Sequence, residues 1–346
     1  HYMCPAFLFM TDNFQKPFKT IDEQIEVLKK RNLIIDDEDV AKKTLQSLSY
    51  YKIINGYQNP FWAKTDYFQN GISFFDVILF YKFDTLMRNN MLNCFLTLET
   101  KIKTIISYEY CKEYGSLGYL EKNNYAIKAD VVKLDKFMET VNKIKADSTK
   151  DLHKANDSQD EPAQPQYFKY ISVRHYIQKY HNVPLWVMME SLTLGNVSVF
   201  YELMPKKVRM NVAKSISELS HVQYTERDIK TILSTMTILR NTCAHGNTIY
   251  NFKIKKNLTD NSFVKNVKQH YTDLNTNNLS LGFIILASVL PNTEVVMMFE
   301  LVSKLYSACV KNYPSRVIEK IKHAMGFDLL KMLDVLKSNM PPYMPY

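Results

Sequence analysis

The chain has 346 residues, 46% hydrophobic and 23% charged, so it can form one large or two ordinary globular domains and is not an intrinsically disordered chain. Glycine is scarce, with 8 residues where average usage of about 7% would give roughly 24, which favours a mostly helical fold with few phosphate-binding loops. The net charge of +9 favours a polyanionic partner, nucleic acid above all, although solubility alone explains it equally well.

The cysteines and the apolar runs indicate in which cellular compartment the protein is expected. The five cysteines are scattered, and no two of them have the spacing of metal ligands, so we expect reduced thiols. No apolar run approaches the roughly 18 residues of a membrane span, and the N-terminal stretch lacks the basic leader of a signal peptide. We therefore expect a cytoplasmic protein without membrane contact.

The N-terminal part, residues 1–72, has the pattern of a small helical module. Thr20 and Glu23 form a capping box at the start of a short amphipathic helix. A second short helix follows the acidic sequence DDED, with Ala41 and Leu45 on its apolar face, and Gly56 ends the helical pattern.

A long helix is predicted over residues 75–113, because Met91, Phe95 and Ile102 recur at helical spacing. Glu99 lies beside this apolar face. Another helix is expected at about 130–146, followed by a polar, proline-containing linker at about 146–166.

The next segments lead to the one place where the sequence suggests chemistry. Pro184 opens a helical run, PLWVMMESLTLGNVSVFYELM, that is apolar almost all round and therefore predicted to be buried. Thr225 and Asp228 cap a further helix, which ends in TILRNTCAHGNTIYN, where Gly246 is a suitable C-cap. We predict an all-α protein with a core at 73–260 and a helical extension at 261–346.

The polar cluster Arg240, Asn241 and His245 could support metal-free RNA cleavage. In that reaction a ribose 2′-OH attacks its own phosphate, histidine moves the protons, and a fixed cation stabilises the phosphorane. Asn241 could orient the phosphate or the imidazole. No HExxH or carboxylate-rich motif is present, so we expect neither a metal ion nor another cofactor.

Spacing alone does not establish such a site. Cations are also favoured at a helix C-terminus, which gives Arg240 and His245 a purely structural explanation. The two residues are five apart, about 140° round a helix. They converge only if the helix end bends or if a second copy of the chain contributes.

The wider sequence resembles a known family. RNTCAHG resembles the Arg-polar-x-x-x-His signature of HEPN ribonucleases, in the form found in abortive-infection (Abi) proteins of the D/F type. The segments KPFKTIDEQIEVLKKRNLIIDDEDVAKKTLQSLSYYKIINGYQNPF, FYKFDTLMRNNMLNCFLTLETKIKTIIS and PLWVMMESLTLGNVSVFYELM resemble the family's preceding segments. Together they cover most of residues 16–251, in the family's order.

This resemblance implies an all-α HEPN core and a metal-independent endoribonuclease that acts as a toxin in antiphage defence, as a homodimer with a composite cleft. Arg240 and His245 match the catalytic pair, Asn241 the polar residue after the arginine, and Glu99 the acidic residue that supports it. Some Abi proteins of the F type associate with a small noncoding RNA, which the charge of +9 would suit. Where the family often continues His-x-Arg-Leu-Trp-Asn, this chain reads GNTIYN and lacks two potential phosphate contacts.

Basic residues outside the motif are candidates for RNA contact. Lys253, Lys255 and Lys256 follow the motif directly, and Arg174 and His181 precede Pro184. Each could instead belong to a solvated face. Because lysine greatly outnumbers arginine, we expect attraction to phosphate and no reading of a DNA sequence.

Two other functions remain open at this stage. The chain could be a non-cleaving RNA-binding scaffold, and a bound RNA that survives intact would favour that function. It could also be an interaction module controlled by a protein antitoxin. A tight partner whose binding resists salt would favour the module, since phosphate-driven binding weakens steeply with salt. Glu99 also has a simpler explanation, an ordinary surface ion pair with Lys103.

Overall fold

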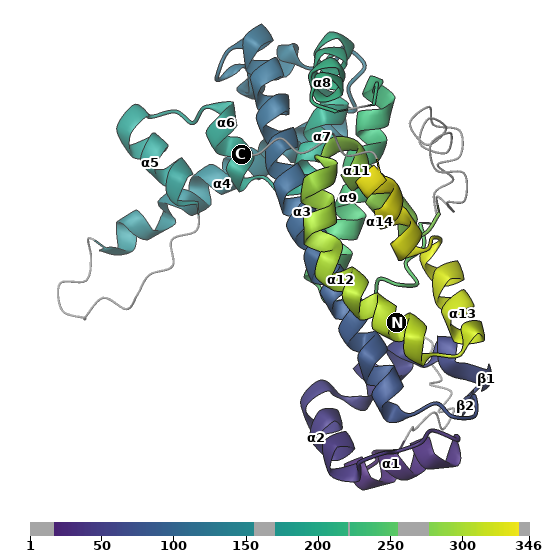
Figure 1. Cartoon of the computed structure of the whole chain (residues 1–346). Helices are drawn as coiled ribbons and strands as arrows, with labels where there is room; N and C mark the ends of the chain where they lie inside the picture. The colour runs from purple at the N-terminus through teal and green to yellow at the C-terminus, as the bar shows by residue number, and fades with distance from the viewer. Residues whose placement is uncertain (1–16, 156–169, 221, 255–276, 339–346) are drawn as a thin grey trace, which may run out of the picture. The chain divides into compact units, whose positions relative to one another are not determined.

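The computed structural model describes residues 17–155, 170–220, 222–254 and 277–338 (Figure 1). These residues are mostly helical, with one small sheet, which confirms the expected all-α fold. The chain divides into two compact units, residues 1–82 and 83–346, and the 41-residue helix α3 (Phe74–Tyr114) begins in the first and continues in the second. The domain boundaries expected after residues 72 and 260 remain predictions.

The first unit contains the two predicted short helices, α1 (Ile21–Lys30) and α2 (Glu38–Leu48). The capping box is present at α1: the Thr20 hydroxyl accepts from the backbone N–H of Glu23, whose carboxylate accepts from the Thr20 N–H. The two helices pack against each other, and Ile25 and Leu28 are buried.

A compact turn region follows α2 in the same unit. A π-helical turn (Tyr51–Asn55) and a 3₁₀ turn (Asn59–Phe61) lead into the hairpin of β1 (Trp62–Lys64) and β2 (Tyr67–Phe68), which are antiparallel. The rings of Tyr57 and Phe61 both pack edge-on against Phe80, with ring centroids 5.8 Å apart. This aromatic contact fixes the first turns of α3 within the unit.

The second unit is a helical bundle built on α3. Its first part contains two 3₁₀ turns (Gly118–Leu120 and Lys122–Asn124), α4 (Val131–Ala155), α5 (Ile171–Tyr180), α6 (Leu185–Ser191), α7 (Leu194–Leu203), α8 (Lys206–Glu218) and α9 (Glu226–Ala244). Helix α7 packs against α9 and α4, and α8 packs against α9. Tyr110 of α3 and Phe137 of α4 both contact the ring of Phe200 on α7, at centroid distances of 5.0 and 5.1 Å.

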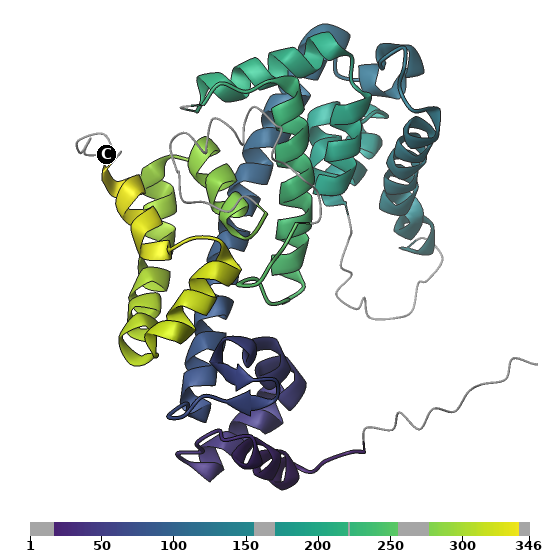
Figure 2. The ribbon, with the colours of Figure 1, turned by 90° about the vertical axis from the view of Figure 1, so that its right-hand side faces the viewer.

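The C-terminal helices complete this bundle: α11 (Ser280–Val289), α12 (Asn292–Asn312), α13 (Ser315–Met325) and α14 (Leu329–Ser338). Helix α12 runs antiparallel to α3, since Tyr306 packs on Phe83 and Glu294 pairs with Lys101 (Figure 2). None of the helices in the described ranges combines the length and hydropathy of a membrane span.

The apolar run that Pro184 opens was predicted as one helix, and this is wrong. It forms two helices, α6 and α7, which are separated by Leu192 and Thr193 in extended conformation. The Thr193 hydroxyl accepts from the Asn196 N–H at 3.2 Å and so caps α7. A side chain that offers this bond gives the backbone an alternative to an unbroken helix.

The helix expected at 130–146 is longer than predicted. Helix α4 continues to Ala155, so the polar stretch expected as a linker from residue 146 begins inside a helix. The hydroxyl groups of Ser148 and Thr149 donate to the carbonyl of Lys145, which satisfies these polar residues within the helix.

Gly282 on α11 lies at a close contact between three helices of the second unit, and the effect of adding a methyl group there can be measured. An added Cβ there would lie 2.8 Å from Met91 Cε and 2.9 Å from Leu239 Cδ1, on α3 and α9. At Gly195 on α7 the nearest atom would be 3.7 Å away. We expect Gly282→Ala to lower the free energy of unfolding by about 1–3 kcal/mol relative to Gly195→Ala, as measured by urea unfolding. Equal stability of the two variants would contradict this packing.

Candidate functional site

Helix α9 presents the three predicted motif residues at its C-terminal end. Its capping box of Thr225 and Asp228 is present as expected, and its apolar stripe is fully buried. The stripe comprises Ile229, Ile232, Leu233, Met236 and Leu239. The last helical residue is Ala244, His245 is the C-cap, and Gly246 ends the helix with a φ of +70°.

Arg240 meets Glu99 of α3, as the sequence suggested. The Arg240 Nε lies 3.5 Å from the Glu99 Oε2, and neither of these two buried atoms has a hydrogen-bond partner in the described part of the chain. Glu99 is buried, whereas 33% of the Arg240 side chain is exposed. The contact is therefore a charge pair that holds the arginine while part of its guanidinium faces solvent.

Glu99 has a second cation as well. Its Oε1 lies 2.8 Å from the Nζ of Lys103, one helical turn further along α3, and this lysine is buried too. The Lys103 Nζ also donates to the Leu192 carbonyl at 2.8 Å. That carbonyl lies at the break between α6 and α7, outside both helices. The expected surface ion pair of Glu99 and Lys103 thus exists, but it is buried and shared with Arg240.

Asn241 and His245 lie at the exposed edge of this arrangement. Arg240 Nη1 donates to Asn241 Oδ1 at 3.4 Å, and the backbone N–H of His245 donates to the Asn241 carbonyl at 3.0 Å. Both residues are exposed. Among the described residues no side chain is in hydrogen-bond contact with the imidazole of His245. The structure therefore groups Glu99, Arg240 and Asn241, and it places His245 one turn away, accessible to solvent.

A buried ion pair on α3 holds the segment that follows His245, and sequence reasoning missed it. Asp84 accepts from the backbone N–H of Tyr250 at 2.7 Å and of Ile249 at 3.2 Å. Arg88 donates to the Asn247 carbonyl at 3.3 Å and to Asp84 at 3.4 Å. We call this pair the Asp84–Arg88 anchor. Two opposite charges four residues apart inside an apolar helical stretch were the available signal.

The thiol of Cys243 lies beneath the motif. Cys243 is buried, and burial raises the pKa of its thiol to about 12. A thiol with so high a pKa contains almost no thiolate near neutral pH, so Cys243 serves as core and not as a nucleophile.

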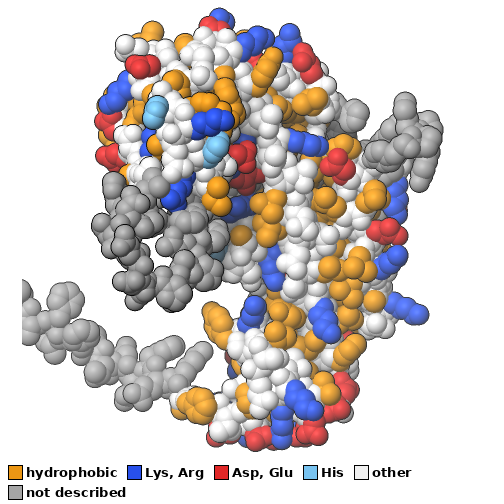
Figure 3. Space-filling model, turned by 90° about the vertical axis from the view of Figure 1, so that its left-hand side faces the viewer, with side chains coloured by type: hydrophobic (Ala, Val, Ile, Leu, Met, Phe, Trp, Pro, Cys, Tyr) orange, Lys and Arg blue, Asp and Glu red, His pale blue; other side chains and the backbone are white. Residues whose placement is uncertain are grey.

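The predicted RNA-contact residues lie in two separate parts of the sequence, and their contact with RNA remains a prediction. Lys253 is exposed in the segment after α9, and Lys255 and Lys256 lie outside the described residues. Arg174 belongs to α5, and His181 is the C-cap of that helix. Figure 3 looks onto the α5 side of the molecule and shows Lys, Arg and His side chains on that face.

Comparison with known proteins identifies the family. The sequence pattern of the Abi-like protein family matches residues 43–251, more than half of the chain. The chain belongs to the Abi-like protein family. This membership suggests a function in abortive infection. Neither a curated protein nor a solved structure matches the chain.

The Abi-like match contains every residue of the arrangement described above. It includes Asp84, Glu99, Lys103 and the whole of α9, and it ends with the GNTIYN segment that the Asp84–Arg88 anchor holds. Helices α11 to α14 lie beyond it. Within the described residues, no group of three or more His, Cys, Asp or Glu side chains is placed to hold a metal ion.

The Asp84–Arg88 anchor is expected to contribute to the free energy of unfolding of this Abi-like chain. Arg88→Met leaves a buried carboxylate without its cation, so we expect the free energy of unfolding to fall by about 3–5 kcal/mol. Lys101→Met, on the same helix, breaks an ion pair of 3.8 Å whose side chains are 40% and 37% exposed. It should change stability by no more than about 1 kcal/mol. Urea unfolding of both variants measures the difference, and similar losses would refute a special role for the anchor.

Proposed function

We propose that this Abi-like chain is a HEPN-type endoribonuclease of abortive infection, which cleaves RNA by attack of a ribose 2′-OH on the adjacent phosphate. The observation that carries the proposal is the charge arrangement at Glu99. A buried carboxylate between Lys103 and Arg240 fixes an arginine whose side chain is 33% exposed at a helix end, beside Asn241 and five residues before an exposed histidine.

The charges of this arrangement suit a phosphorane. Lys103 and Arg240 each carry a positive charge and Glu99 carries a negative one, so the three groups together are positive by one unit. Lys103 is turned inward to Glu99 and to the Leu192 carbonyl. The available cationic surface is therefore that of Arg240, whose planar, permanently charged group can donate two hydrogen bonds to phosphate oxygens.

His245 would move the protons. An imidazole can take the proton of the attacking 2′-OH or give one to the leaving 5′ oxygen, because its ordinary pKa of about 6.5 is close to neutral pH. Its exposed position at the C-cap allows substrate to reach it. Asn241, whose side chain accepts from Arg240, would orient the guanidinium or the bound phosphate.

The proposal includes a homodimer and an RNA partner. Arg240 and His245 are five residues apart on α9, and a second copy placed against this end could complete the cleft. The net charge of +9 supports binding of an RNA, as substrate or as an associated noncoding RNA. The resemblance of the motif to HEPN ribonucleases supports both parts.

The two motif residues provide the direct test. We expect His245→Ala to lower RNA cleavage by about 10²–10⁴-fold and Arg240→Ala by about 10²–10³-fold, both assayed in EDTA, with helical content and unfolding midpoint unchanged. His323→Ala, which removes an exposed histidine from α13, should cleave at the wild-type rate. The products should carry 2′,3′-cyclic phosphate and 5′-hydroxyl ends, since the 2′ oxygen is the nucleophile.

Other results would redirect the proposal. Full cleavage by His245→Ala in EDTA would reject the mechanism, as would products that end in 3′-hydroxyl and 5′-phosphate. A specific RNA that co-purifies intact, together with no effect of Arg240→Ala on cell growth, would identify a binding scaffold. Tight, salt-insensitive capture of a protein would identify an interaction module.

Glu99 gives a separate prediction as a positioning residue. Glu99→Gln keeps the shape but removes the charge that holds Arg240, so we expect cleavage to fall about tenfold. The loss should vanish in an Arg240→Ala background, because the two residues act as one unit. Comparison of single and double variants in the same cleavage assay measures this. Losses that simply multiply would show that Glu99 acts independently of Arg240.

A further inference from the structure

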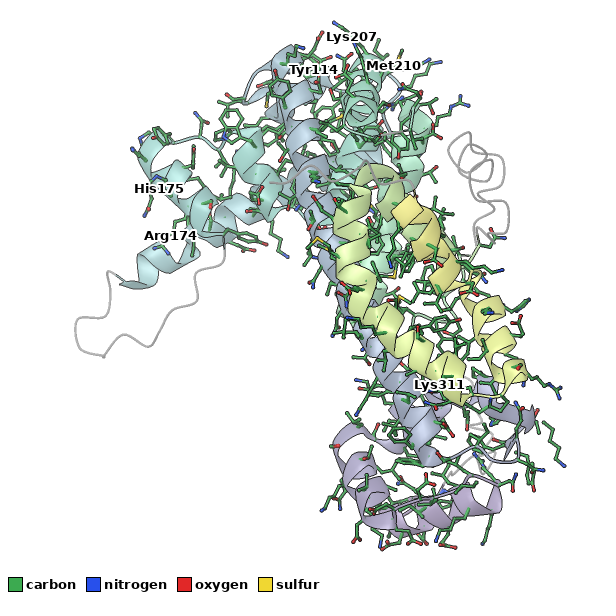
Figure 4. The ribbon with its side chains drawn as sticks, in the orientation of Figure 1. Tyr114, Arg174, His175, Lys207, Met210 and Lys311 are labelled. Carbon is green, nitrogen blue, oxygen red and sulfur yellow. The ribbon has the colours of Figure 1, made fainter. Side chains whose placement is uncertain are left out.

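A cavity of about 290 Å³ lies between α4 and α5, away from the motif on α9. Its polar lining comes from Lys145 and Thr149 of α4 and from His181 and Asn182 at the end of α5, and its apolar lining includes Ile177 and Val183. Among the described residues, no carboxylate lines it, and the sequence of α5 contains neither Asp nor Glu. Figure 4 shows α5 projecting beside α4, with Arg174 and His175 labelled on it.

Lys145 is the unusual group in this cavity. It is partly buried, and no described carboxylate or hydrogen-bond acceptor meets its ammonium group. Burial lowers the pKa of Lys145, which is the direction expected for a cation that loses water without gaining a counter-charge. An anion that enters the cavity would supply that missing counter-charge.

His181 is held in an uncommon backbone conformation at the same place. It has a φ of +58° at the C-cap of α5, in the left-handed region that glycine adopts without strain and other residues seldom occupy. A histidine in this position therefore costs stability compared with glycine, which directs attention to what its imidazole does in the cavity.

The other polar groups of the cavity, Thr149 and Asn182, can form hydrogen bonds with uncharged parts of a ligand as well. The Thr149 hydroxyl donates to carbonyls of its own helix, so its free lone pair offers an acceptor to a ligand hydroxyl. Asn182 offers both a donor and an acceptor, which suits the edge of a heterocyclic base, and Ile177 and Val183 offer apolar contact. A cavity of this volume is at the lower end of the sizes found for small-ligand sites.

We propose that the α4–α5 cavity binds one nucleotide, with its phosphate at Lys145 and His181, its hydroxyls at Thr149 and its base edge at Asn182. The same chemistry is offered by a free nucleotide and by one unit of a single-stranded RNA. This site is additional to the motif on α9, and it stands whether or not the chain cleaves RNA.

The test uses the full chain and two soluble probes. Isothermal titration with 5′-AMP examines the free nucleotide, and titration with a 2′-O-methyl uridine oligomer of about 12 nucleotides examines the strand. The oligomer lacks the 2′-OH nucleophile, so it stays intact under the cleavage chemistry proposed for α9. Inorganic phosphate serves as a third probe and shows how much of the affinity comes from the anion alone.

Three variants separate this site from general charge effects. Lys145→Gln should weaken nucleotide binding about tenfold or more. Lys143→Gln removes the same charge from an exposed position two residues away and should have an effect of less than about twofold. His181→Gly should weaken binding while the unfolding midpoint stays the same or rises, because it removes the imidazole and relieves the backbone.

The outcomes distinguish the ligand sources. Binding of 5′-AMP that depends on Lys145 and His181 supports the site with a free nucleotide as ligand, whereas the same dependence for the oligomer alone supports it with a strand. If wild-type chain binds neither probe, or if Lys143→Gln and Lys145→Gln lose affinity equally, the proposal is overturned. If the chain binds 5′-AMP in this way but does not cleave RNA, the nucleotide site is supported and the nuclease proposal is rejected.

Discussion

A carboxylate that leaves water must be neutralised, and at Glu99 this requirement shapes the surroundings of the motif. Lys103 neutralises it from the same helix, and Arg240 approaches from α9. With two cations at one carboxylate, the outer one retains hydrogen-bonding capacity toward solvent. The proposed phosphate-binding group is thus Arg240, because Glu99 holds its guanidinium in place but does not use all of its hydrogen-bond donors. The arrangement joins α3 to α9 through Glu99 and Arg240 and to the turn before α7 through Lys103, while α7 itself packs against α9.

The same principle operates at the other end of the motif, with a different result. Asp84 has Arg88 as its cation, and it directs its remaining capacity to backbone N–H groups of Ile249 and Tyr250. The carboxylate of Asp84 therefore bonds to groups of the protein itself, and these bonds fix the path of the backbone after His245. One helix, α3, therefore supports both the arginine of the motif and the segment that follows its histidine. The GNTIYN sequence, where the chain departs from the pattern of the family it resembles, is partly buried and is held by Asp84 and Arg88.

The sequence predicted the helices well because their apolar periodicity and caps are local. The capping boxes at Thr20 and Thr225 and the long α3 are examples. The break at Leu192 and Thr193 was missed, since apolar residues on both sides conceal a capping threonine. Glu99 was placed near Arg240 by resemblance and near Lys103 by spacing, and both contacts exist. The contacts of the Asp84–Arg88 anchor could not be predicted from the sequence. Its partners are backbone groups more than 150 residues away, and a backbone group is the same whatever residue carries it.

The bond from Lys103 to the Leu192 carbonyl has a consequence for how this protein can change over time. A main-chain oxygen is present whichever residue occupies the position, so mutation of Leu192 cannot delete it. Only a change in the path of the backbone, such as closing the gap between α6 and α7 into one helix, would withdraw it. The electrostatic support of Arg240 therefore does not depend on which side chain stands at position 192, as long as the backbone keeps this path.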